Sequence, residues 1–288
     1  LELGFVDEHP QIKSVIWCPG TGQTGFNALG EIVAGEVNPS GHLVDTYCND
    51  NSTAPSLVNF YGTQYANATE DNNAEWYDFM LDGNKYYNVY SEGIYIGYKW
   101  YETADAEGYW DAESNEHGTG YDAVVQYPFG YGLSYTSFDW KVTGATANGS
   151  ALTKDGNVTV KVTVTNTGDR AGKDVVQLYY TAPYTAGGIE KSSVELGAFA
   201  KTKELAPGES EEVTLTVPVS DMASYDAYDA NHNGFTGYEL DAGDYIFTVR
   251  HDAHDVDDDA NATITCSLPA GVQYAEDTAT GNAVSNKF

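Results

Sequence analysis

Strict alternation of apolar and polar residues in two segments constrains the fold more than any other feature of this sequence. Every second residue of 158–165 is valine, and the residues between are threonine or lysine. Residues 213–219 repeat the pattern, with Pro218 at an outward position, where its missing N–H costs least. A period of two is typical of a β-strand with one buried and one solvated face. Both segments therefore predict strands of an all-β unit.

Further strand and turn patterns surround these two segments. Candidate strands are "DVVQLYYTAP", "ELGAFAKTKEL", "DYIFTV" and "ATITCS". Turn residues lie between them at Thr167–Asp169, Ala206–Ser210 and Asp241–Asp244. About seven short strands in a segment of this length favour an immunoglobulin-like sandwich. We expect the sandwich to occupy residues 136–270 and a polar tail or linker to occupy 271–288.

The first 45 residues have a different pattern, typical of a β-α-β unit. "SVIWC" at residues 14–18 is a short apolar run of the buried-strand type, and "GHLVD" at 41–45 is a second candidate strand. Between them, one helical face carries Phe26, Leu29, Ile32 and Val33. Gly35 is placed to end that helix. We therefore expect an α/β layer with a parallel sheet, followed by the all-β sandwich.

Residues 46 to 135 are rich in tyrosine, asparagine and glycine, with weak periodicity. Aromatic clusters lie in "EWYDFM", "NKYYNVY" and "IYIGYKWYE". So many aromatic side chains favour ordered loops that pack on a neighbouring element. We assign residues 1–135 to one part of an α/β domain with long aromatic loops.

A glycine-rich loop in the β-α-β segment raises the question of nucleotide binding. Gly20, Gly22 and Gly25 fit G-x-G-x-x-G, and Asp45 follows at the spacing of a ribose-binding carboxylate. However, the helical pattern stops after one unit, Pro19 stiffens the loop, and no basic residue is nearby to meet a pyrophosphate. We interpret the glycines as a tight strand-to-helix turn and expect no nicotinamide or flavin cofactor.

The charge balance excludes several classes of partner. The chain has 13 basic and 43 acidic residues, a formal net charge of -30. Such a surface repels nucleic acid and anionic membranes, so we expect neutral or cationic partners. No apolar run is long enough to span a membrane. The composition predicts a soluble chain and leaves open whether it is cytoplasmic or secreted.

Four ordered motifs carry a resemblance to glycoside hydrolase family 3. "PGTGQTGFNALGEIVAGEVNPSGHLVDTY" resembles the closing segment of the α/β sandwich domain of that family. "YSEGIYIGYKWYET" and "YPFGYGLSYTSF" are similar to the segments that follow it. "TVTNTGDRAGKDVVQLYYTAP" and "LAPGESEEVTLTV" resemble its fibronectin type III-like domain. The resemblance explains the glycine loop without a nucleotide.

The resemblance implies part of a retaining β-glucosidase or related β-glycosidase, which acts on terminal β-linked sugars of a glucoside or oligosaccharide. A retaining reaction uses two carboxyl groups about 5–5.5 Å apart. In the family, the nucleophile is an Asp of a separate barrel domain and the acid/base is usually a Glu upstream of the matched segment. We therefore nominate no catalytic residue in this chain. The barrel is the implied partner, in the same polypeptide or as a second chain.

Four residues of the aromatic segment are candidates for contact with the sugar. Glu92, Trp100, Tyr101 and Glu102 combine aromatic faces with carboxylates, which stack on and hydrogen-bond to pyranose rings. The alternative is a packing strip that joins the two parts of the chain. The alternative function is a non-catalytic carbohydrate-binding or adhesive module, but such a module would leave the apolar face of the helix bare.

Two polar segments suggest metal ligands but fit them poorly. "DANHNGFTGYEL", from Asp229, reads D-x-N-x-N-G like a calcium loop, yet Glu239 falls one position short of the expected bidentate ligand. We interpret it as a hairpin loop and predict that calcium adds little stability. His251 and His254 would point to opposite faces of a strand, so we expect no zinc site.

Overall fold

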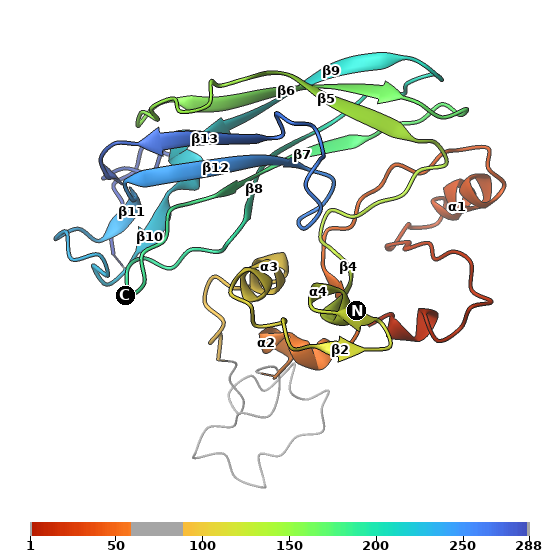
Figure 1. Ribbon diagram of the computed structural model, residues 1–288, viewed down its shortest axis with the longest axis horizontal. Coiled ribbons are helices and arrows are strands. Elements are labelled where there is room, and N and C mark those ends of the chain that lie inside the picture. Colours follow the sequence, from red (N-terminus) through yellow and green to blue (C-terminus); the bar gives the residue numbers. More distant parts are fainter. Residues whose placement is uncertain (1, 59–88, 287–288) are drawn as a thin grey trace, which may run out of the picture.

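The computed structural model describes residues 2–58 and 89–286 (Figure 1). A β-sandwich made by the second half of the chain lies beside a smaller lobe of short helices and strands. The lobe is formed mainly by residues 46–58 and 89–127, and helix α1 (Phe26–Val33) lies apart from it. The two parts of the chain that have different residue patterns therefore correspond to two different architectures.

The sandwich consists of two antiparallel sheets. One sheet has the order β5-β6-β9, with bounds Phe138–Ala145, Asn157–Asn166 and Ser210–Pro218. The other has the order β13-β12-β7-β8, with bounds Thr263–Leu268, Gly243–Arg250, Val175–Thr181 and Glu195–Lys201. All strand pairs within the two sheets are antiparallel. This is the predicted immunoglobulin-like arrangement.

The predicted alternation forms the core between the sheets. The four valines of β6 are completely buried, while the residues between them are at least partly exposed. Tyr245, Phe247 and Val249 of β12 face them with no exposed surface. Burying a side chain of this size stabilises a fold by about 1.5–3 kcal/mol relative to leaving it exposed. The burial of every second residue in these strands thus accounts for the core of the sandwich.

A small third sheet extends the sandwich at one end. It has the order β10-β11-β14, with bounds Ser224–Asp226, Gly237–Leu240 and Val272–Tyr274. A 3₁₀ helix, η5 (Val219–Met222), leads into it from β9. Tyr274 is buried against the core. The start of the predicted tail is therefore paired with β11.

The lobe is built from short elements. In chain order these are η1 (Gly4–Val6), β1 (Tyr47–Cys48), η2 (Asn51–Thr53), α2 (Pro55–Val58), α3 (Tyr98–Ala106), β2 (Ser114–Asn115), β3 (Gly118–Thr119), α4 (Tyr121–Val124) and β4 (Val125–Tyr127). β1 pairs with β4 and β2 with β3, both antiparallel. Cys48, Tyr101, Trp110 and Val124 belong to its separate small core.

The lobe covers the outer face of the four-stranded sheet. Tyr98 at the start of α3 stacks on Phe129 with ring centroids 4.6 Å apart, and its edge contacts Tyr179 of β7 at 6.1 Å. Tyr179 is completely buried although it faces away from the sandwich core. β7 is consequently buried on both faces. For this reason the sequence of β7 does not alternate between apolar and polar residues.

Gly130 allows the connecting segment to approach the sheet closely. It has a φ of 86°, and a Cβ there would lie 2.2 Å from Gln177 Oε1. The Gln177 side chain donates to the Gly130 carbonyl at 3.0 Å and to the His251 carbonyl at 2.6 Å. Buried Gln177 therefore ties the connection to the sandwich.

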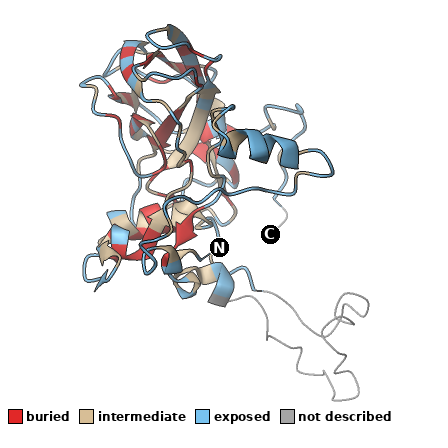
Figure 2. Cartoon of the chain, turned by 90° about the vertical axis from the view of Figure 1, so that its right-hand side faces the viewer, coloured by how far each residue is buried: buried red, intermediate tan, exposed pale blue. Residues whose placement is uncertain are grey.

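The β-α-β prediction is only partly correct. Helix α1 (Phe26–Val33) forms, and Gly35 follows its end with a φ of 74°. Residues 14–18 and 41–45 are not strands, and Ile16 and Trp17 of the first segment are nearly half exposed. A parallel strand needs neighbouring strands to satisfy its backbone groups, and the described residues place none beside these segments. No residue of α1 is buried, as Figure 2 illustrates.

Some predictions concern residues 59–88, outside the described part of the chain. They include the cluster "EWYDFM" and most of "NKYYNVY". Within the described ranges, no helix has the length and apolar character needed to cross a membrane. The three cysteines are free thiols.

Candidate functional site

Three of the four candidate residues are consecutive on helix α3. The helix begins at Tyr98 after Gly97, whose φ of 58° turns the chain sharply. Successive residues of a helix point about 100° apart. Trp100, Tyr101 and Glu102 consequently project in three directions, and they have different surroundings.

The side chains of Trp100 and Tyr101 both contact Thr53 of η2. The Trp100 indole N–H donates to the Thr53 carbonyl at 2.9 Å, and the Tyr101 hydroxyl lies 3.2 Å from Thr53 Oγ1. Both rings contact Trp110, at centroid distances of 6.0 and 6.4 Å. Tyr101 is 4% exposed, and burial raises the pKa of its hydroxyl, which therefore stays protonated. Trp100 remains partly exposed.

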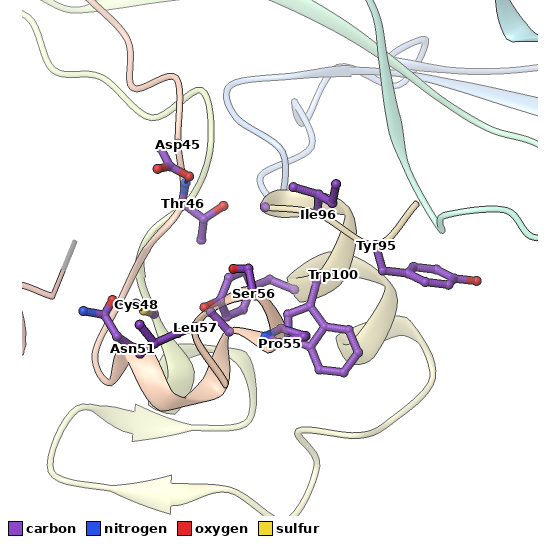
Figure 3. Close-up of a pocket in the computed structure, with 13 residues that line it drawn as sticks. Asp45, Thr46, Cys48, Asn51, Pro55, Ser56, Leu57, Tyr95, Ile96 and Trp100 are labelled. Atoms are coloured by element: carbon purple, nitrogen blue, oxygen red, sulfur yellow. Dashed lines mark hydrogen bonds between the residues drawn. The ribbon is translucent and has the colours of Figure 1, made fainter. Parts of the chain in front are cut away.

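An open groove of about 490 Å³ runs beside these two residues (Figure 3). Its walls come from the segment around β1, from η2 and α2, and from the start of α3. The lining residues are Asp45, Thr46, Cys48, Asn51, Ala54, Pro55, Ser56, Leu57, Tyr95, Ile96, Gly97, Trp100 and Tyr101. The groove combines apolar walls with a few polar groups, which is the usual composition of a small-molecule site.

Two polar groups of the groove were not singled out by the sequence as sugar contacts. Thr46 is 6% exposed, and its Oγ1 is buried with no hydrogen-bond partner in the part of the chain that the structure describes. Asp45, considered above only as a ribose ligand, lies next to it and accepts from the Thr46 backbone N–H at 2.9 Å. Asp45 and Thr46 are far from α3 along the chain and come close to it only in the folded protein. No local sequence pattern therefore identifies them as residues of the site.

Glu102 points away from the groove toward the sandwich. It is 5% exposed, accepts from the Tyr121 hydroxyl at 2.5 Å, and lies 3.0 Å from His254 Nδ1. The Tyr121 and His254 rings stack with centroids 3.7 Å apart. His254 follows β12, and its backbone N–H donates to Asp252. We name Glu102, Tyr121 and His254 the Glu102 clasp, because it joins the lobe to the sandwich.

The charges around the clasp determine its protonation. Burial lowers the pKa of His254, but the hydrogen bond and charge of Glu102, with Asp105 and Asp252, outweigh burial and raise it above the ordinary value. Burial raises the pKa values of Asp105 and Asp252. Burial and Glu102 also raise the pKa of Tyr121, whose hydroxyl stays a donor. The clasp is therefore best formed with a protonated His254.

This arrangement predicts a stability that decreases with rising pH. Because the folded pKa of His254 lies above 6.5, its contribution to the free energy of unfolding is complete below pH 6.5 and is lost as the pH rises through the folded pKa. More than a third of the His254 side chain is exposed, so we expect a loss of only about 0.5 kcal/mol. Urea unfolding of the wild type and of His254→Gln, at about pH 6 and about pH 8.5, measures it.

Glu102→Gln provides the matched control for the clasp. It should remove the same pH-dependent change in the free energy of unfolding. The double variant should lose no more of this pH dependence than either single variant. Burial also raises the pKa values of Asp105 and Asp252, and both carboxyl groups are retained in His254→Gln, so the difference between the wild type and this variant reports the contribution of His254. An unchanged pH dependence in His254→Gln would contradict the role of the clasp.

The other sequence candidates lie elsewhere. Glu92 is half-buried before α3, does not line the groove, and its Oε2 has no hydrogen-bond partner among the described residues. Gly22 has a φ of 66°, as a tight turn requires. His251 pairs with Asp257 at 3.1 Å, whereas His254 pairs with Glu102, so the two histidines serve different carboxylates.

Comparison with known proteins relates both parts of the chain to one enzyme family. Residues 2–98 match the glycosyl hydrolase family 3 C-terminal domain, and residues 174–253 match the fibronectin type III-like domain. The chain belongs to glycosyl hydrolase family 3. The fold is accordingly part of the α/β sandwich domain of family 3 followed by a fibronectin type III-like sandwich, as the motifs predicted.

Several similar proteins are β-glucosidases, and two from Bifidobacterium are exo-alpha-(1->6)-L-arabinopyranosidases. Beta-glucosidase A of Butyrivibrio fibrisolvens is 37% identical over 82% of this chain and 25% of its own length. A β-glucosidase of Ruminococcus albus is 33% identical over 88% of this chain and 21% of its length. The crystal structure of a β-glucosidase from Paenibacillus barengoltzii superposes with a TM-score of 0.70 at 33% identity, over 96% of this chain and 26% of the other. The chain thus spans about a quarter of the family 3 relatives that it matches.

Proposed function

We propose that this chain is part of a retaining β-glucosidase, or of a closely related β-glycosidase, and that both catalytic carboxylates lie outside it. The similarity to β-glucosidases along nearly the whole chain carries this proposal. The substrate is a terminal β-linked glucoside or oligosaccharide, a neutral ligand that suits a strongly acidic surface. Reconstitution of hydrolysis with the barrel tests it.

The bare apolar surface of the N-terminal segment supports a role within a larger assembly. Phe26 and Val33 of α1 are 66% and 69% exposed, and Ile16 and Trp17 are nearly half exposed. Several large exposed apolar side chains in one segment are typical of an interface with another part of a protein. A partner domain that supplies the missing strands would cover it. This argues against a stand-alone carbohydrate-binding or adhesive module.

We further propose that the groove beside α3 contacts the sugar. Aromatic faces stack on the apolar faces of pyranose rings, and hydroxyl and carboxylate groups bind the ring hydroxyls. Trp100 supplies the accessible part of the aromatic wall and Asp45 supplies the polar group, whereas Tyr101 and Thr46 line the groove but are only 4% and 6% exposed. Glu102 acts behind this wall by fixing α3 against the sandwich.

Replacement of Trp100 by Ala in the assembled enzyme is expected to weaken sugar binding. Loss of one stacking face costs about 1–1.5 kcal/mol, so KM for an aryl β-glucoside should rise roughly tenfold while kcat changes by less than about twofold. Steady-state kinetics measure the two parameters separately.

Trp100→Phe is the matched control for this change. It retains an aromatic face but loses the indole hydrogen bond to Thr53. KM should therefore remain within about threefold of the wild type. Equal rises in KM for both variants would show that the hydrogen bond to Thr53, and not the aromatic face, carries the effect.

A further inference from the structure

The loop between β10 and β11 has an ordered conformation that the sequence alone did not establish. Asp229, Asn231 and Asn233 occupy alternate positions and precede Gly234. The Gly234 N–H donates to Asp229 Oδ1 at 3.0 Å, and the Phe235 N–H donates to Asn233 Oδ1 at 2.8 Å. These bonds tie the Asp229 and Asn233 side chains to the backbone of the loop.

Glu239 provides a second and independent observation. It is 3% exposed on β11, and its Oε2 lies 2.5 Å from the Asn233 side-chain amide. Its Oε1 is buried without any hydrogen-bond partner among the described residues. A position count along the chain made Glu239 one residue short of a ligand, and the expectation that calcium adds little stability rested on that count alone. The strand nevertheless brings its carboxylate directly to the loop.

The neighbouring charges leave the Glu239 carboxylate uncompensated. Lys191 Nζ lies 3.1 Å from Asp241 Oδ2 and forms an ion pair with that carboxylate, although it makes no hydrogen bond within the described residues. Asp226 accepts backbone N–H groups at 2.8 and 3.0 Å and is satisfied by them. Within the described ranges no lysine, arginine or histidine forms an ion pair with Glu239. A buried carboxylate with a bare oxygen is unfavourable unless a cation or a proton meets it.

We propose that Asp229, Asn231, Asn233 and Glu239 form a calcium-binding site. Calcium takes six to eight oxygen ligands from carboxylates, amide carbonyls, backbone carbonyls and water, and it tolerates irregular geometry. Across the described residues, no three His, Cys, Asp or Glu side chains converge as a metal cluster. The site instead relies on two carboxylates supplemented by two asparagine oxygens.

Calcium binding to the chelator-stripped full chain tests this proposal. At a calcium concentration about a hundred times the dissociation constant, the melting temperature of the wild type should rise by about 5 °C. Equilibrium dialysis should show one ion released by chelator. Magnesium at the same concentration should give a much smaller shift, because it demands stricter octahedral geometry.

Two variants and a control locate the ion. Glu239→Gln and, at a less buried position, Asp229→Asn should each abolish the calcium-induced shift. Asp221→Asn removes one exposed acid outside the loop and should retain the full shift. No shift in the wild type, equal shifts with magnesium, or an undiminished shift in both loop variants would overturn the proposal, because the effect would then come from general screening of the acidic surface.

Discussion

Replacement of Phe247 by Ala is expected to lower the free energy of unfolding of the sandwich by about 3–5 kcal/mol. Phe247 lies in the middle of β12 with no exposed surface, and its ring centroid is 6.2 Å from that of Tyr180. Removal of the ring forfeits its transfer free energy and leaves a cavity between two sheets that cannot collapse completely. Urea unfolding of the full chain, followed by circular dichroism, measures the change.

Ile246→Ala is the matched control on the same strand. Ile246 points to the opposite face and is 39% exposed, so its truncation should cost only about 1 kcal/mol or less. Equal losses for the two variants would contradict the inward and outward assignment of β12, and with it the predicted register of the sandwich.

The sandwich was largely predictable because side chains of a strand alternate strictly between its two faces. That rule identifies β6, β9 and β12 from three or four apolar residues each. It did not single out β5, whose register is interrupted by an irregularity between Val142 and Gly144. It also gave no reason for the double burial of Tyr179 on β7, which depends on Tyr98 and Phe129 of the lobe.

The predicted β-α-β unit shows what a local pattern leaves undetermined. Helix α1 satisfies its backbone hydrogen bonds within itself, so its sequence suffices to predict it. Strands at 14–18 and 41–45 would need neighbouring strands from elsewhere; without them neither segment is a strand, and Ile16, Trp17 and Val44 remain exposed.

The candidate site was predictable only in part for the same reason. An aromatic and acidic run identified Trp100, Tyr101 and Glu102, but not that helix α3 directs Glu102 away from the other two. Thr46 joins the groove from a segment far away along the chain. Contacts across such separations follow from tertiary packing and leave no trace in residue spacing.

The largest expected effect concerns catalysis. Purified residues 1–288 should not hydrolyse an aryl β-glucoside, because a retaining reaction requires a nucleophile and an acid/base about 5–5.5 Å apart around one anomeric carbon. Addition of the barrel and the rest of the sandwich domain, in one polypeptide or as a second chain, should restore hydrolysis with retained β configuration. The assembled enzyme should exceed the isolated chain by at least about 10⁶-fold in rate. Replacement of the barrel Asp nucleophile by Ala should abolish turnover in the assembly.

The rate of aglycone release by the isolated chain tests the central claim most directly. The chain should be produced in a host that lacks β-glucosidase activity and assayed alone and with the remaining domains. We predict the uncatalysed background rate for the chain alone, and multiple turnover only when the remaining domains are present. Steady multiple turnover by residues 1–288 alone would contradict the account, because the catalytic pair would then lie among the carboxylates of this chain.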